Sequence, residues 1–257
     1  MNLRDRVVIV TGGGSGIGAA LARRFADEKP RALILGDLDL GSARDVAGGI
    51  GAEALQVDVA DPASNDALID AVEDRFGRVD LFCANAGIGF AGDEQTPPER
   101  WDFMWQVNLM SHVHAARRLI PGWLARGEGY FLSTASAAGL LTNLKAAQYS
   151  VTKHAAVSFA EWLAITYGDQ GIKVSCLCPM GVKTRLLDAA DEFHALLDPL
   201  AIEPEQVAEA VVQGLAEEHF LILPHPDVAR FFQNKANDYD HWIGGMRKLQ
   251  RTVFPTG

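Results

Sequence analysis

The chain has 257 residues, of which 48% are hydrophobic and 22% are charged, a composition typical of a globular protein with a sizeable core. Its formal net charge of −10 argues against binding to nucleic acid and to anionic lipid surfaces. No apolar run approaches the roughly 18 residues that span a membrane. The first residues also lack the pattern of a signal peptide. We therefore expect a cytoplasmic protein with neither nucleic acid nor a membrane as a partner.

The chain contains three cysteines, Cys83, Cys176 and Cys178. An odd and sparse count of this kind is not a disulfide framework. Cys176 and Cys178 flank a leucine within an apolar run, which predicts buried strand thiols. A zinc site would need a second pair of ligands. The sequence shows no such pair, so we expect no metal.

Short apolar runs alternate with longer helical patterns along the chain. The runs predict strands over residues 7–11, 32–35, 54–57, 81–84, 130–133, 174–177 and 220–223. Helices are predicted over about 16–28, 42–50, 66–75 and 147–167, with another that begins near residue 96. For that helix, Thr96 is expected as N-cap, Pro97 at N1 and Glu99 at N3, which together form a capping box.

Fully apolar strands with intervening helices imply a parallel sheet that is covered on both faces. Right-handed crossovers then give a doubly wound α/β fold. No Pro-, Gly- or Ser-rich linker divides the chain. We therefore expect one domain over residues 1–257, in which residues 225–257 form a helical C-terminal extension.

The segment from Thr11 to Gly18 reads TGGGSGIG and joins the first predicted strand to the first helix. Glycines allow a tight turn and let the backbone approach a pyrophosphate, while the helix N-terminus offers free N–H groups and partial positive charge. A glycine-rich turn without a ligand is the alternative. The position between strand and helix favours a dinucleotide-binding loop.

Asp37 lies 19 residues after Gly18, at the end of the second predicted strand. A carboxylate at this point accepts hydrogen bonds from the adenosine ribose hydroxyls. It also repels the 2′-phosphate of NADP. No arginine follows it closely, and Asp39 adds negative charge. We therefore predict NAD as the cofactor.

Tyr149 and Lys153 lie four residues apart on the long predicted helix, so they share one face. A phenol has a pKa of about 10, which a fixed cation lowers. Such a phenol can exchange a proton with a substrate oxygen. Taken alone, the spacing also fits an exposed tyrosine and lysine with no special role. Ser136 precedes Tyr149 by 13 residues.

In this order, the motifs resemble those of the short-chain dehydrogenase/reductase family, over nearly all of residues 5–224. The resemblance implies a Rossmann-like fold of about seven strands and an NAD-dependent enzyme that acts on CH–OH groups. It implies catalytic roles for Asn108, Ser136, Tyr149 and Lys153. The cofactor contacts that it implies are Gly12, Ser15, Gly16, Ile17, Gly18, Asp37, Leu38, Asp58, Val59, Asn85, Ala86, Gly87, Tyr149, Lys153, Pro179, Gly181, Val182 and Thr184.

The resemblance also implies a mechanism in which hydride passes between the nicotinamide and a carbinol or carbonyl carbon. Tyr149 acts as general acid/base. Lys153 lowers its pKa and binds the nicotinamide ribose. Ser136 positions the substrate oxygen, and Asn108 holds a relay water. For the asparagines Asn85 and Asn108 the alternative is that they merely tie down the ends of strands and helices.

One departure from the family pattern is Met180, where the motif P-G-x-x-x-T usually has glycine.

The residues after the catalytic motifs are mostly apolar and predict a moderately apolar secondary alcohol or ketone as substrate. The candidate pocket residues, any of which fits an ordinary core equally well, are Ile88, Phe90, Leu140, Leu141, Thr142, Asn143, Met180, Leu186, Leu187 and His194. Residues 185–199 are predicted as a helical lid.

Apolar residues at helical spacing over 228–249 predict a helix with a weak point at Gly244–Gly245. That helix docks on a partner subunit or borders the pocket, and the alternative is that it packs on its own domain. The family implies a homodimer or homotetramer.

Two other functions stay open. An NADPH-linked carbonyl reductase would share the fold, but Asp37 disfavours it. A catalytically silent dinucleotide-binding regulator would typically lack the tyrosine or the lysine, and this chain keeps both.

Overall fold

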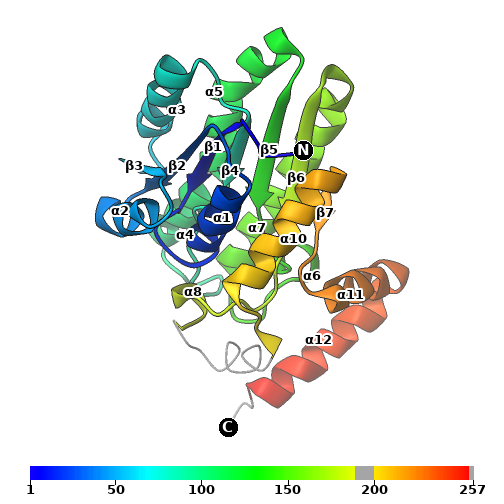
Figure 1. The fold of residues 1–257 in the computed structure, drawn as a ribbon. Helices are drawn as coiled ribbons and strands as arrows, with labels where there is room; N and C mark the ends of the chain where they lie inside the picture. The colour runs from blue at the N-terminus through cyan, green and yellow to red at the C-terminus, as the bar shows by residue number, and fades with distance from the viewer. Residues whose placement is uncertain (189–199, 255–257) are drawn as a thin grey trace.

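The computed structural model describes residues 1–188 and 200–254 of the chain. Its centre is a seven-stranded parallel sheet in the order β3-β2-β1-β4-β5-β6-β7 (Figure 1). The strands are β1 (Val7–Thr11), β2 (Ala32–Asp37), β3 (Glu53–Gln56), β4 (Leu81–Ala84), β5 (Gly129–Thr134), β6 (Ile172–Leu177) and β7 (Leu221–Ile222). The predicted doubly wound fold is thus confirmed.

Helices follow the strands in alternation. The described helices are α1 (Gly16–Asp27), α2 (Leu40–Gly48), α3 (Pro62–Phe76), α4 (Pro98–Trp105), α5 (Ser111–Arg126), α6 (Ala138–Leu141), α7 (Ala147–Tyr167), α8 (Arg185–Asp188), α10 (Pro204–Glu217), α11 (Pro226–Asn237) and α12 (Tyr239–Val253). A π-helical turn over Gln106–Met110 joins α4 to α5. The part of the chain that the structure describes contains no helix long and apolar enough to cross a membrane.

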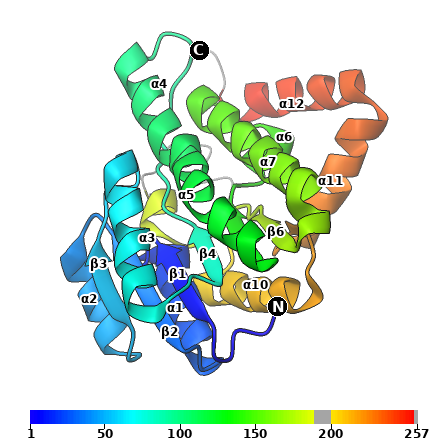
Figure 2. The same cartoon turned by 90° about the horizontal axis from the view of Figure 1, so that it is seen from above.

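Two hydrophobic cores lie on opposite faces of the sheet. Val7 and Ile9 of β1 pack with residues of α3, α5 and α7, whereas Val8 and Val10 pack with residues of α1, α2 and α10. Figure 2 shows the same two layers of helices on either side of the strands. Burial on both faces explains why the strands read as continuous apolar runs rather than as alternating patterns.

The strand order reverses between β1 and β4. β1 pairs in parallel with β2 on one side and with β4 on the other. From β1 the chain first builds outward through β2 and β3, and it then returns to place β4 beside β1. A crevice forms outside the carboxyl ends of the strands at such a reversal, and ligands bind there in open α/β sheets. The fold therefore places the glycine-rich loop after β1 at this position.

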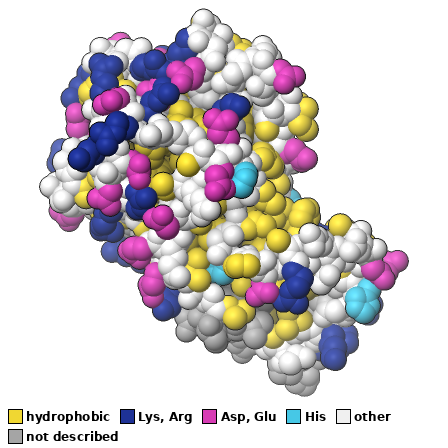
Figure 3. Space-filling view, turned by 45° about the vertical axis from the view of Figure 1, so that its right-hand side comes forward, with side chains coloured by type: hydrophobic (Ala, Val, Ile, Leu, Met, Phe, Trp, Pro, Cys, Tyr) yellow, Lys and Arg dark blue, Asp and Glu magenta, His cyan; other side chains and the backbone are white. Residues whose placement is uncertain are grey.

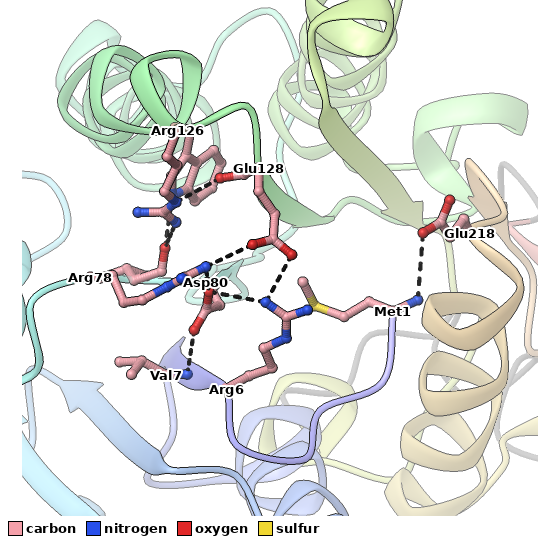
Figure 4. Close-up of polar contacts among 10 residues, drawn as sticks. Met1, Arg6, Val7, Arg78, Asp80, Arg126, Glu128 and Glu218 are labelled. Atoms are coloured by element: carbon pink, nitrogen blue, oxygen red, sulfur yellow. Dashed lines mark hydrogen bonds and ion pairs between the residues drawn. The ribbon is translucent and has the colours of Figure 1, made fainter.

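At the opposite end of the sheet, a polar network surrounds Asp80, whose side chain is only 2% exposed (Figure 4). One carboxylate oxygen accepts a hydrogen bond of 2.8 Å from the backbone N–H of Val7. The other lies 3.5 Å from the guanidinium of Arg6 and also pairs with Arg78. Both arginines pair in addition with Glu128 at 2.8 Å. The network joins the starts of β1, β4 and β5.

The helix that begins near residue 96 is confirmed, but its predicted cap is wrong. Pro97, not Thr96, is the N-cap residue of α4, and no side chain caps that end. The Thr96 hydroxyl instead accepts a hydrogen bond of 3.1 Å from the backbone N–H of Asp93. The preceding loop therefore takes the hydroxyl that the capping box would have used.

The C-terminal region is helical, as predicted, but its break lies elsewhere. The chain turns at Asp238, which has φ −149° and caps α12 by accepting from the N–H of His241 at 2.8 Å. The helix α12 runs through Gly244 and Gly245 without interruption. Figure 3 shows hydrophobic side chains gathered where α11 and α12 meet the body of the molecule.

Candidate active site

The glycine loop after β1 packs tightly, and four of its glycines (Gly12, Gly13, Gly16 and Gly18) have no room for a side chain or lie in the left-handed region. Gly12 has φ +66° and Gly16 has φ +50°. A Cβ at Gly12 would lie 2.9 Å from the Cα of Ala86, and one at Gly18 would collide with the Gly12 carbonyl. The loop delivers the chain into α1, whose first-turn N–H groups have no partner within the helix. This geometry fits a pyrophosphate at the helix N-terminus.

The Asp37 carboxylate is fixed beside the glycine loop. One oxygen accepts from the backbone N–H of Gly14 at 2.9 Å, and the other accepts from that of Asp39 at 3.0 Å. The neighbouring Leu38 is 65% exposed. These contacts orient the carboxylate at the end of β2, where the sequence predicts the ribose contact.

The predicted adenine contacts lie at the end of β3. Asp58 is exposed, while Val59 is buried. The backbone N–H of Asp58 donates to the Ser64 hydroxyl at 3.0 Å, and its carboxylate accepts from the N–H of Ala60 at 2.9 Å. The turn is thereby held by its own side chains.

The Asn85–Gly87 segment is tied to β1 through Thr11. The Thr11 hydroxyl accepts from the N–H groups of Asn85 and Ala86 at 3.0 and 3.1 Å, and it donates to the Cys83 carbonyl at 3.1 Å. The Asn85 amide donates to the Thr11 carbonyl at 3.0 Å. The Asn85 side chain thus ties two strand ends together, which was the alternative weighed from the sequence.

Tyr149 and Lys153 lie on α7 and face the carboxyl ends of β4 and β5. The Lys153 side chain is 3% exposed, and its Nζ donates to the Thr134 carbonyl at 3.0 Å. The Nζ lies 5.7 Å from the centre of the Tyr149 ring. A Cβ at Gly89 would lie 3.2 Å from the Tyr149 ring, so the absence of a side chain there lets the loop approach the phenol closely.

Burial dominates the electrostatics of this pair. It lowers the pKa of Lys153 to about 8 because a buried ammonium loses its hydration. For the same reason burial raises the pKa of Tyr149, and hydrogen bonding with the Ser136 side chain partly offsets this. The net direction of the Tyr149 pKa is therefore upward, and the Lys153 Nζ is directed to the Thr134 carbonyl. The expectation that the Lys153 charge by itself lowers the Tyr149 pKa stays a prediction.

Ser136 follows β5 and is buried. Its hydroxyl accepts from the N–H of Ala138 at 3.1 Å and donates to the Pro179 carbonyl at 3.4 Å. The N–H of Ala137 also donates to the Pro179 carbonyl, at 2.7 Å. The loop that carries Ser136 is therefore fastened to the loop that follows β6.

Asn108 lies in the π-helical turn, a feature often found at functional sites. Its side-chain oxygen accepts from the Ile88 N–H at 2.9 Å, and its amide nitrogen donates to the Ile88 carbonyl at 2.9 Å and to the Thr152 hydroxyl at 3.2 Å. The side chain thus holds the loop after β4 against α7. This matches the alternative in which Asn108 ties down the ends of strands and helices. A relay water would have to use the remaining main-chain groups of this turn.

The loop after β6 returns to the glycine loop. Pro179, Gly181 and Val182 are buried. A Cβ at Gly16 would lie 3.1 Å from the methyl carbon of Thr184, so Thr184 faces the start of α1. Between the two loops lies a hollow that Ser15, Gly16, Arg23, Lys183, Thr184 and Arg185 help to line.

The candidate pocket residues divide into several groups. Leu140 and Leu141 belong to the buried core, and Leu186 on α8 is 42% exposed. The Phe90 ring lies under the guanidinium of Arg100, 4.1 Å from ring centre to Cζ, and therefore packs toward α4. His194 and most of the predicted lid lie outside the described residues. The described start of that lid, α8, is helical.

The hydrogen-bonding roles of several residues at the site were not predicted from the sequence. Thr11, Thr134 and Thr152 hold the motif residues through hydrogen bonds, and the Thr134 contact uses only a backbone carbonyl, which no sequence pattern reveals. His225 also reaches the site, from the far C-terminal region. In residues 1–188 and 200–254 no cluster of three or more potential metal ligands occurs.

Comparison with known sequences identifies the relatives of this chain. A model of the short chain dehydrogenase family matches residues 6–195. The 1-deoxy-11-beta-hydroxypentalenate dehydrogenase of Streptomyces exfoliatus is 30% identical over 247 residues, which cover 93% of this chain and 90% of that protein. The meso-2,3-butanediol dehydrogenase of Serratia marcescens is 31% identical over 228 residues, which cover 85% of this chain and 90% of that protein.

Solved structures agree with this relationship. A short-chain dehydrogenase/reductase from Burkholderia phymatum in complex with NAD has a TM-score of 0.84 at 28% identity, covering 93% of this chain and 96% of its own. The 3-ketoacyl-(acyl-carrier-protein) reductase of Brucella melitensis complexed with NADH has a TM-score of 0.79 at 31% identity, covering 86% and 96%. This chain belongs to the short-chain dehydrogenase family.

Proposed function

We propose that the protein is an NAD-linked oxidoreductase that transfers a hydride between the nicotinamide and a moderately apolar secondary alcohol or ketone. The observation that carries the proposal is the buried Lys153 ammonium beside Tyr149 and Ser136. Burying a cation without a counter-ion costs free energy. A cost of this kind is typical of functional sites, where perturbed pKa values cluster.

The residues present fit a dinucleotide. The tightly packed glycine loop leads into the N-terminus of α1, where a pyrophosphate would bind, and Asp37 would accept hydrogen bonds from the adenosine ribose. Ser15, Ile17, Leu38, Asp58, Val59, Asn85, Ala86 and Gly87 would line the adenosine side and the pyrophosphate. Pro179, Gly181, Val182 and Thr184 would hold the nicotinamide end. When bound, the nicotinamide supplies the hydride acceptor or donor.

We infer an NAD preference from the charge of Asp37, which disfavours a 2′-phosphate. The relatives from Burkholderia phymatum and Brucella melitensis, solved with NAD and NADH, support this choice. An NADPH-linked carbonyl reductase is the alternative that the cofactor experiment below decides.

The protein groups supply proton transfer and orientation. Tyr149 gives its phenolic proton to the substrate oxygen during ketone reduction and takes it back during alcohol oxidation. Its raised pKa keeps the phenol protonated at neutral pH, which suits the reduction. In the oxidation, the nearby Lys153 charge favours the phenolate that forms. Ser136 would donate to the substrate oxygen, and Asn108 would help hold a water that links Lys153 to solvent.

We infer a substrate class from the side chains at the site and from the relatives, which include a dehydrogenase of meso-2,3-butanediol. Met180 and Ile88 are partly buried and apolar, and both pack against the core beside the site. A secondary alcohol with a short apolar substituent on each side would match such surroundings.

The test is a panel of secondary alcohols offered with NAD and with NADP, with reduced nicotinamide followed by absorbance. We expect turnover with NAD that exceeds the turnover with NADP at least about tenfold in kcat/KM, or about 1.4 kcal/mol. Faster turnover with NADP would select the carbonyl reductase. NAD binding without turnover on any alcohol or ketone would select the catalytically silent regulator.

We also propose that the enzyme is a cytoplasmic homodimer or homotetramer. Exposed apolar residues on α7, Trp162 at 52% and Ile165 at 77%, support burial of this helix against a second copy. Light scattering should give a mass of two or four chains, and a monomer would contradict the proposal.

A further inference from the structure

His225 is a buried histidine that the catalytic motifs do not include. It lies between β7 and α11, at the N-cap of α11, and is 5% exposed. Its ring reaches the backbone of the loop that follows β6, at the position where methionine replaces the usual glycine. Two residues of that loop, Met180 and Gly181, are its partners.

The two contacts define one protonation state of the imidazole. The Met180 N–H donates to Nδ1 at 3.2 Å, so Nδ1 carries no proton. Nε2 lies 3.0 Å from the Gly181 carbonyl, which only accepts, so Nε2 carries the proton and donates. The ring is therefore neutral, with its hydrogen on Nε2. A second proton would place an N–H on Nδ1, facing the Met180 N–H.

The imidazole thus bridges two consecutive peptide groups of the loop. The Gly181 carbonyl accepts a second hydrogen bond, from the Ile202 N–H at 3.1 Å, and the Pro179 carbonyl accepts from Ala137. In contrast, the Met180 N–H has His225 as its partner. An amide buried without a partner costs about 1–3 kcal/mol. The conformation of the loop at Met180 therefore depends on this ring.

We propose that His225 is a positioning residue that clamps the Met180–Gly181 backbone, and that its protonation releases the clamp and weakens cofactor binding in acid. This inference rests on the proposed function, because the clamped loop is the one proposed to hold the nicotinamide end. His225 acts through the backbone and touches neither cofactor nor substrate.

The surroundings of the ring favour the neutral form. Burial lowers the pKa of His225, while the Gly181 and Leu200 carbonyls and the Asp227 charge raise it. Among the described residues, Asp227 on α11 is the charged group whose field acts on the ring. The loop over Pro179–Val182 and the segment from Leu221 to Pro224 contain no acidic or basic side chain. Protonation is therefore expected below the ordinary pKa of 6.5.

Two substitutions separate the clamp from the titration. In His225→Ala both hydrogen bonds are lost. In His225→Asn the amide oxygen can take the place of Nδ1 and accept from Met180, and this side chain does not titrate. The matched control is His219→Asn, which removes a histidine whose side chain is 63% exposed. Circular dichroism at each pH verifies that every variant is folded.

The first measurement is the NADH dissociation constant by fluorescence, from about pH 7.5 to about pH 4.5. We expect wild type and His219→Asn to lose affinity about tenfold in acid. His225→Ala should bind about tenfold more weakly already at neutral pH. His225→Asn should stay within about threefold of wild type at neutral pH and lose little in acid. Wild-type affinity in His225→Ala, or an unchanged acid loss in His225→Asn, overturns the proposal.

A second measurement needs no cofactor and so separates this inference from the proposed function. Hydrogen exchange of the Met180 amide, corrected for intrinsic rates, should show protection in wild type at neutral pH and loss of protection in acid. The amide should be unprotected in His225→Ala and protected at both pH values in His225→Asn. If NADH fails to bind wild type, the proposed function is wrong and exchange still decides the clamp. An unprotected Met180 amide in neutral wild type overturns the clamp.

Discussion

Two charged side chains are buried at opposite ends of the sheet, one with ion-pair partners and the other without. Asp80, before β4, is 2% exposed, accepts from the Val7 N–H and pairs with Arg6 and Arg78. Lys153, beyond the end of β5, is 3% exposed and donates to a backbone carbonyl. No ion pair formed by the described residues includes Lys153.

We infer from this difference that the buried charge of Asp80 stabilises the fold, whereas the buried charge of Lys153 serves catalysis. Removing one partner of a buried ion pair destabilises a protein because the other charge is left uncompensated. A buried cation without a counter-ion already carries that cost in the native state. We therefore expect substitutions at the Asp80 end to lower stability and leave turnover intact, and substitutions at the Lys153 end to remove turnover without loss of stability.

The largest effect is expected for Tyr149→Phe. This change removes the hydroxyl that we propose exchanges the proton, and general acid/base catalysis contributes about 10²–10⁴-fold. The drop in kcat should lie in this range, with NADH affinity within about threefold of wild type, since the ring remains. Steady-state rates and a fluorescence titration measure the two quantities. Turnover close to that of wild type would remove Tyr149 from its role.

A smaller effect is expected for Asp37→Asn, which tests a carboxylate that is held by backbone N–H groups. The amide keeps an oxygen that can accept from Gly14, but the negative charge is lost. The ratio of kcat/KM for NADP over that for NAD should rise about tenfold or more, because repulsion of the 2′-phosphate ends. An unchanged ratio would show that Asp37 does not choose the cofactor.

At the other end of the sheet, Asp80→Asn should lower the free energy of unfolding by about 1–3 kcal/mol. The low end is expected because Arg6 and Arg78, with side chains 31% and 34% exposed, are partly solvated. The kcat of this variant should match that of wild type. Urea denaturation measures the first quantity. A variant of unchanged stability and lowered kcat would break the comparison.

Much of the fold could be predicted from the sequence because local physics determines it. The strand β1 and the helix α7 match their predicted ranges, since buried parallel strands are apolar throughout and a long helix has a clear period. The glycine loop could be predicted because positive φ at Gly12 and Gly16 favours glycine, which leaves a recognisable pattern in the sequence.

Other features depend on contacts between distant residues, which no local pattern reveals. The Thr96 hydroxyl accepts a hydrogen bond from the Asp93 N–H and does not cap α4. The direction of the Tyr149 pKa depends on burial by several elements. His225 meets Met180 across 45 residues of sequence, so its contact is visible only in three dimensions. The break at Asp238 instead of Gly244–Gly245 shows that a cap outweighs weak helix propensity.

The effect of Lys153→Met on stability tests the comparison most sharply, because its sign differs from that of most core substitutions. In Lys153→Met a buried ammonium becomes an apolar side chain of similar length. The pKa of Lys153 is lowered from 10.5 to about 8, so charging the native site costs free energy. Between these values unfolding takes up a proton, and wild-type stability should therefore rise as the pH rises from about 8 to 10.5. The variant should lack this rise.

The most direct measurement is urea denaturation of Lys153→Met beside wild type near neutral pH, with turnover and NADH affinity measured on the same samples. The control is Lys173→Met, which changes a lysine that is 48% exposed and pairs with Glu218 at 2.9 Å. We predict that Lys153→Met gains about 1–2 kcal/mol of unfolding free energy while it loses turnover and binds NADH more weakly. A less stable Lys153→Met, or one that keeps its turnover, would contradict the claim that Lys153 is buried for chemistry.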